Sequence, residues 1–132
     1  MSDRKPEGGT GDSRDDLKVA VAAYAQSEKV KSGLIWVSQV ADLVAAMTGA
    51  ERTQGLALLQ PFARMVADEA HLAGRLTGDR SWHEIGQKIN MALVMIDSGV
   101  PQETGFHLTQ ALTRVTRIGG QAAALLARNG LY

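Results

Sequence analysis

The sequence contains no cysteine. Disulfide bonds, thiol nucleophiles and thiolate metal sites are therefore excluded, and the absence fits a reducing cytosol. Without disulfides, stability must come from the packing of apolar side chains. Because 45% of the 132 residues are hydrophobic, the chain has enough apolar material for the core of one domain.

An excess of charge is also missing, because 14 basic residues balance 14 acidic ones. No net field therefore draws the chain toward nucleic acid or an anionic membrane. Aromatic residues are scarce at 5%, and only Phe106 lies among the arginines near the carboxyl end. A surface that binds nucleic acid by stacking needs aromatic and basic residues interleaved, so the sequence does not favour such a partner.

Long hydrophobic runs are absent as well. No stretch of about 18 uncharged apolar residues could span a bilayer, and the first 16 residues lack the apolar segment of a secretory signal. These absences predict a cytoplasmic protein without a membrane segment. Residues 1–12 are polar and include Pro6 and three glycines, so we expect a disordered tail followed by a single domain over residues 13–132.

What the sequence does have is helical periodicity, with no sustained alternation typical of strands. A first helix is expected from Ser13, which forms a capping-box pattern with Asp16, to a C-cap at Gly49. The pair Ser32-Gly33 could bend or divide it. A second helix is expected from about residue 50 to residue 76, with a kink or a fresh start at Pro61.

Two more helices follow. Ser81 and Glu84 form a second capping-box pattern at the start of the third, which Gly99 should end in a left-handed conformation. Pro101 suits the first turn of a fourth helix, which Asn129-Gly130 closes. Short connections favour antiparallel neighbours, so the prediction is an all-α, up-and-down bundle of four helices, or five if the first divides.

The apolar positions predict which face of each helix meets the core. The expected core positions are Trp36, Val40, Leu43, Val44 and Met47; Phe62, Met65, Val66, Ala73 and Leu76; Trp82, Ile85, Ile89, Leu93 and Ile96; and Leu108, Ala111, Leu112, Val115, Ile118, Ala122 and Leu126.

Glu69 falls near the middle of the apolar arc of the second helix. A carboxylate there must pair with a base, accept hydrogen bonds or stay protonated, unless it reaches water where the register changes. Asn90 lies beside the stripe of the third helix, where an amide can fix register, and Arg114 and Arg117 share a face of the fourth. These four residues form a candidate ligand or specificity site between the helices.

The string Asp68-Glu69-Ala70-His71 matches the name motif of a helicase family, but the phosphate-binding loop that must accompany it is missing. Ala70-His71 also resembles the start of the Ala-His-x-x-Lys-Gly motif of histidine phosphotransfer domains, which are small all-α bundles. Gly74 and Arg75 stand where that motif has lysine and glycine. The resemblance implies a solvent-facing histidine at position 71.

No nucleophile-base pair and no set of convergent metal ligands is visible, so neither an enzyme nor a bound cofactor is expected. The segment Leu34, Ile35, Trp36 and Val37 is apolar all round, which a monomer of this size would struggle to cover. We therefore expect a non-enzymatic bundle that associates with protein, foremost with a second copy as a homodimer. The alternative is a small-ligand or signalling module of the phosphotransfer type, with a polar site around Glu69.

Overall fold

The computed structural model describes residues 11–132 and confirms the all-α fold class. Four α-helices and one 3₁₀ turn follow one another along the chain: α1 (Arg14–Ala45), α2 (Gly49–Thr77), α3 (Ser81–Asp97), η1 (Pro101–Glu103) and α4 (Gly105–Ala127). The predicted disorder of residues 1–12 falls mostly outside the described residues.

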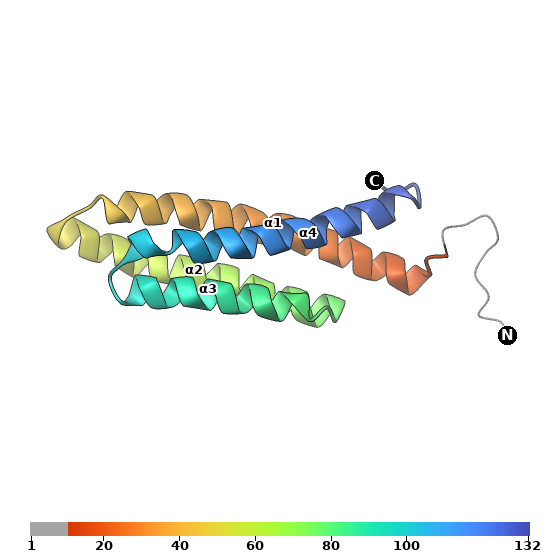
Figure 1. The fold of residues 1–132 in the computed structure, drawn as a ribbon, viewed down its shortest axis with the longest axis horizontal. Helices are drawn as coiled ribbons and strands as arrows, with labels where there is room; N and C mark the ends of the chain where they lie inside the picture. Colours follow the sequence, from red (N-terminus) through yellow and green to blue (C-terminus); the bar gives the residue numbers. More distant parts are fainter. Residues whose placement is uncertain (1–10) are drawn as a thin grey trace.

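The four helices pack antiparallel to their neighbours in the sequence, and α4 closes the bundle against α1 (Figure 1). The two ends of the described chain lie at the same end of the bundle. There α1 and α4 extend past the turn between α2 and α3 (Figure 1). Asp12 accepts hydrogen bonds from Arg128 and Asn129 at this end, which ties the segment before α1 to the end of α4. No described helix is both long enough and apolar enough to cross a bilayer.

Helix α1 begins as predicted. Ser13 accepts a hydrogen bond from the backbone N–H of Asp16, and the Asp16 carboxylate accepts one from the backbone N–H of Ser13. The helix then runs unbroken through Ser32-Gly33, so the division considered for the first helix does not occur. Gly33 is buried, and a Cβ placed there would lie 2.8 Å from a methyl group of Val66. The glycine therefore lets α1 and α2 approach closely.

The link between α1 and α2 corrects the expected C-cap at Gly49. Helix α1 ends at a C-cap on Ala46, and Gly49 is instead the first residue of α2, with a φ of +60°. Arg52 holds this end of the bundle together. Its guanidinium donates to the carbonyl oxygen of Ala45 at 3.1 Å and to that of Gly99 at 2.8 Å, which joins the end of α1 to the link between α3 and α4.

Pro61 does not divide α2, which is one helix on both sides of the proline. Proline removes the backbone N–H that would bond to the carbonyl of residue 57. Both Ala57 and Pro61 are exposed, so water can hydrate that carbonyl. At its other end, α2 is closed by Gly78, which adopts a φ of +70° and donates its N–H to the carbonyl of Gly74 at 2.9 Å.

The start of α3 differs from the predicted capping box. Ser81 is the first residue of the helix rather than its cap, and its backbone N–H donates to the Asp79 carboxylate at 2.9 Å. Because the backbone N–H of Ser81 already donates to Asp79, Ser81 and Glu84 do not form the two hydrogen bonds of a capping box. Farther on, Gly99 has the predicted positive φ of 80°. Pro101 opens the 3₁₀ turn η1 instead of α4, which begins only at Gly105, so the predicted start of the fourth helix at Pro101 is wrong.

The core confirms the faces predicted for α3 and α4. All the predicted positions of α3 are buried, and those of α4 are buried except for the half-buried Leu112. The faces predicted for α1 and α2 are confirmed only in part. Val44, Val66 and Ala73 are buried, and Val40, Met47 and Phe62 are half-buried against the core. The prediction is wrong for the four exposed positions, which are Trp36, Leu43, Met65 and Leu76. The residues that fill the core from these two helices include many alanines: Ala23, Val30, Leu34, Val37, Ala41 and Val44 from α1, and Leu59, Ala63, Val66, Ala67, Ala70 and Ala73 from α2.

Candidate association surface

Large apolar side chains that the pattern assigns to the core stand on the outside of α1 and α2. On α1, Trp36 and Leu43 are exposed, and Val40 and Met47 are half-buried between and beside them. Successive members are three or four residues apart, so they form one stripe along the helix. This stripe flanks the alanine-containing face that enters the core.

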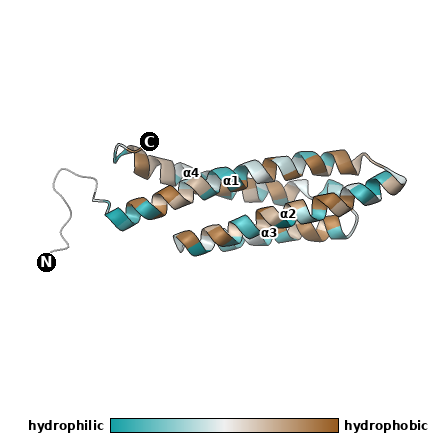
Figure 2. Ribbon diagram, turned by 180° about the vertical axis from the view of Figure 1, so that it is seen from behind, coloured by the Kyte–Doolittle hydropathy of each residue, from teal (hydrophilic) through white to brown (hydrophobic). Residues whose placement is uncertain are grey.

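Helix α2 carries a matching stripe. Leu58, Met65 and Leu76 are exposed, while Phe62 and Leu72 are half-buried. The spacing of three, four or seven residues is that of the apolar seam in packed helices. Figure 2 shows hydrophobic turns recurring along α1 and α2.

An ion pair shows that the two stripes adjoin. Lys29 Nζ lies 3.4 Å from Glu69 Oε1. Lys29 is seven residues, about two turns, before Trp36 on α1, and Glu69 is seven residues after Phe62 on α2. The paired sides of the two helices are therefore the sides that carry the stripes. We call Trp36, Val40, Leu43 and Met47 together with Leu58, Phe62 and Met65 the apolar face.

The register between the helices brings the stripes to the same level. Gly33 lies opposite Val66, and Gly55 lies opposite Val44 and Met47, as expected for an antiparallel hairpin. Trp36 is thus level with the segment between Phe62 and Met65. The apolar face is therefore one continuous surface along the groove between α1 and α2.

The size of the apolar face is that of a large surface patch. The exposed fractions of Trp36, Leu43, Leu58 and Met65 are 58%, 64%, 73% and 63%. With roughly 200 Å² for each large side chain, these four expose on the order of 500 Å². The largest apolar patch on a typical monomer covers about 300–600 Å² and is often functional. The face is at the upper end of that range before its half-buried members are added.

The predicted association segment, Leu34, Ile35, Trp36 and Val37, does not form a single surface, because its side chains lie in three different environments. Leu34 and Val37 are buried in the core, whereas Trp36 belongs to the apolar face. Ile35 is exposed on the other side of α1, beside Leu108 and Leu112 of α4. A helix turns by about 100° per residue, so four consecutive residues cannot share one surface.

Glu69 is half-buried at the border of the apolar face rather than in the core. Besides the ion pair with Lys29, its carboxylate accepts a hydrogen bond from the side-chain amide of Gln26 at 3.2 Å. The same amide also contacts the backbone carbonyl of Glu69 at 3.3 Å. Glu69 therefore joins α1 to α2 as a paired and partly hydrated carboxylate.

The other three candidate residues do not meet Glu69. Asn90 is exposed on α3, so it is not the buried amide that the pattern allowed. On α4, Arg114 Nε lies 3.2 Å from Glu84 Oε1, and Arg117 is exposed. Since Glu69 lies on the seam of α1 and α2, no shared site is formed between the helices.

Within residues 11–132, no group of three or more histidine, aspartate or glutamate side chains is placed to hold a metal ion. His71 is exposed on α2, where the resemblance to phosphotransfer domains implied a solvent-facing histidine. Comparison adds no family. No protein-family model, curated protein or solved structure matches this chain. Function must therefore be argued from the surfaces of the molecule itself.

Proposed function

We propose that this protein acts by self-association, as a homodimer formed through the apolar face. The proposal rests on where small and large apolar residues lie on α1 and α2. Alanines such as Ala63, Ala67 and Ala70 occupy the core, while Trp36 and Leu58 stand in solvent. Leaving large apolar side chains outside is unfavourable in a monomer, and a partner that covers them recovers their burial free energy.

The dimensions of the apolar face suit a dimer of this kind. A standard interface buries about 800 Å² on each partner. The four most exposed residues supply on the order of 500 Å² of this. The remainder can come from the half-buried Val40, Met47 and Phe62 and from a polar rim. An apolar centre with a polar rim is the usual composition of such interfaces.

Charges at the two ends of the apolar face favour a second copy as the partner. Glu51 lies 18 residues, about five turns, before Glu69 and hence on the same side of α2. Lys29 lies at the opposite end, with a side chain that is 58% exposed. Lys29 pairs with Glu69 of its own chain, so a two-fold axis near Phe62 would place Glu51 of each copy beside this ion pair of the partner subunit. There the exposed ammonium of Lys29 can contact both carboxylates, which is compatible with an isologous interface.

The test is the dimer dissociation constant of Leu58→Gln, measured by sedimentation velocity. Burying a full leucine side chain stabilises by about 1.5–3 kcal/mol, and in a two-fold dimer each substitution acts twice. Because Leu58 is 73% exposed, the loss should be about 2–4 kcal/mol, or at least about 30-fold in the dissociation constant.

The matched control is Val94→Gln on α3, because Val94 is also exposed, at 57%, but lies outside the apolar face. This substitution should change the dissociation constant less than about twofold. Equal weakening by both variants would reject the apolar face as the interface. Circular dichroism should show native helix content in both, since neither side chain contributes to the core.

A further inference from the structure

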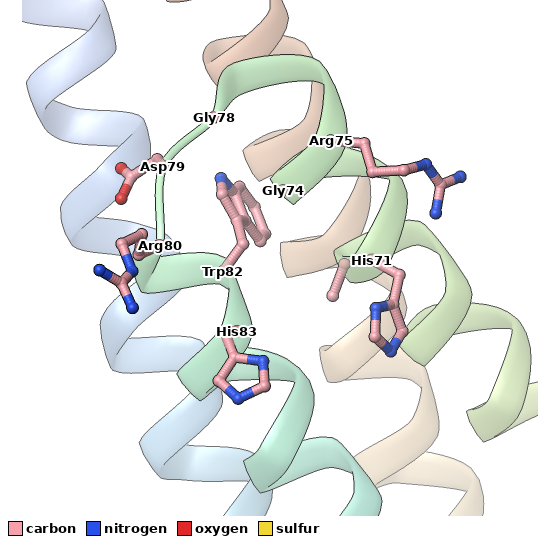
Figure 3. Close-up of a pocket in the computed structure, with 9 residues that line it drawn as sticks. His71, Gly74, Arg75, Gly78, Asp79, Arg80, Trp82 and His83 are labelled. Carbon is pink, nitrogen blue, oxygen red and sulfur yellow. The ribbon is translucent and has the colours of Figure 1, made fainter.

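A pocket of about 280 Å³ lies at the turn between α2 and α3, away from the apolar face. It is lined by residues from the last two turns of α2, from the turn itself and from the start of α3 (Figure 3). Gly74 and Gly78 provide part of the lining without side chains. Ligand pockets usually measure about 300–1,000 Å³, so this one suits a small molecule or a single functional group.

Basic side chains gather around the pocket. His71 and Arg75 come from α2, and Arg80 and His83 come from the start of α3. Figure 3 shows both imidazoles extending on the same side of the turn, whereas the side chains of Arg75 and Arg80 point outward on opposite sides of it. Within the described part of the chain, none of the four has an ion-pair partner. Asp79 also lines the pocket, but its carboxylate accepts the backbone N–H of Ser81.

Trp82, which lines the pocket, carries a buried donor with no acceptor among the described residues. Trp82 is 2% exposed, and its indole Nε1 has no hydrogen-bond partner among residues 11–132. In Figure 3 the indole nitrogen points toward the turn at Gly78, which also lines the pocket. A buried N–H without an acceptor is unfavourable, and most such groups in folded proteins are satisfied by a protein atom, water or a ligand.

We propose that this pocket binds a phosphate group carried by a small soluble molecule. The lining offers donors of three kinds, namely indole, imidazole and guanidinium N–H groups, together with the positive charge of Arg75 and Arg80. A carboxylate has two oxygens to share among these donors, whereas a phosphate group presents three strong acceptor oxygens. Arginine is suited to phosphate because its planar fork can donate two parallel hydrogen bonds. The inference does not depend on the proposed dimer.

The experiment follows the two indole N–H signals of the full chain by ¹H–¹⁵N NMR during a titration with inorganic phosphate. The chain has two tryptophans, and a Trp36→Phe variant identifies the signal of Trp82. The Trp82 signal should move downfield and saturate as its N–H gains an acceptor, while the Trp36 signal stays in place. Sodium chloride at equal ionic strength should leave both signals unchanged.

The double variant Arg75→Gln with Arg80→Gln should weaken phosphate binding about tenfold, since each exposed charge pair contributes up to about fivefold. The matched control is Arg64→Gln, an exposed arginine about 16 Å from Arg75 along α2. It should change the affinity less than twofold.

Three results would overturn the proposal: a Trp82 signal that does not move, an equal response to chloride, or equal weakening by the control. Vesicles containing phosphatidic acid provide a further arm. Binding to these vesicles without binding to inorganic phosphate would show a membrane surface instead of a small soluble ligand, and would also reject the proposal.

Discussion

Gly33→Ala tests the close approach of α1 and α2 at this glycine. Alanine is favoured over glycine inside a helix by about 1 kcal/mol, so the substitution would stabilise an open position. At Gly33 the new Cβ would lie 2.8 Å from Val66 Cγ2 and 3.3 Å from Val66 Cγ1. Valine has essentially one side-chain rotamer in a helix, so it cannot turn away and the two helices must separate.

Overpacking of this kind destabilises by about 1–3 kcal/mol. After the gain in helix propensity, Gly33→Ala should lower the free energy of unfolding by about 1 kcal/mol. The matched control is Gly120→Ala in α4, because a Cβ there meets no atom within 4 Å. That substitution should raise the free energy of unfolding by about 0.5–1 kcal/mol.

The assay is urea unfolding followed by circular dichroism at one fixed protein concentration, because dimerisation makes apparent stability depend on concentration. The midpoints should move in opposite directions while the slope stays constant. A Val66→Ala background should remove the penalty at position 33, since both Cγ atoms are then absent. If Gly33→Ala instead stabilises as much as Gly120→Ala, the helices are farther apart at this level than the structure places them.

Three further predictions follow from named contacts. Arg52→Ala should lower the free energy of unfolding by about 1.5–3 kcal/mol in urea unfolding, because it removes charged hydrogen bonds to the end of α1 and to Gly99; a change under 0.5 kcal/mol would contradict this. Glu69→Gln should cost less than about 1 kcal/mol in the same assay, because its ion pair is partly exposed and screened; a larger loss would show a buried charge. The hydrogen bond to Tyr132, and then burial, raise the pKa of Tyr24 above its ordinary value. The stability that the neutral Tyr24 hydroxyl contributes should therefore be present below about pH 10 and be lost as the pH rises further. Tyr132→Phe should lower the Tyr24 pKa in an ultraviolet titration, and an unchanged pKa would show that the hydrogen bond is not its cause.

The fold class could be predicted from sequence because helical periodicity and turn residues agree along the whole chain. The buried faces of α3 and α4 could also be predicted, since their cores consist largely of branched or aromatic residues such as Ile85, Ile89 and Val115. Capping was less certain. Ser13 and Ser81 both precede an acid by three residues, but only Ser13 forms the capping box, because Asp79 occupies the N–H of Ser81.

The faces of α1 and α2 could not be predicted because hydrophobicity gives weight to large side chains. Close packing of these helices selects small residues, and Gly33 and the alanines of α2 meet that need. Four of the predicted core positions, Trp36, Leu43, Met65 and Leu76, are therefore exposed. Because the buried side of α2 differs from the predicted side, Glu69 lies at the border of the apolar face and not in the core. There its carboxylate pairs with Lys29 and accepts a hydrogen bond from Gln26.

The pocket at the turn between α2 and α3 had no sequence signal beyond His71. Its histidines and arginines come from two helices that only the turn brings together. Trp82 was predicted as a core residue, and it is one. A pattern of letters cannot show that its indole nitrogen lacks an acceptor, because that depends on the path of the turn at Gly78.

If a second copy of the chain covers the apolar face, the protein is a dimer in solution. The most direct test is the mass of the protein in solution, measured by light scattering over a range of concentrations. The proposal predicts a mass that rises to twice the 14.1 kDa of one chain and then stays constant. A mass equal to one chain at every concentration would contradict it.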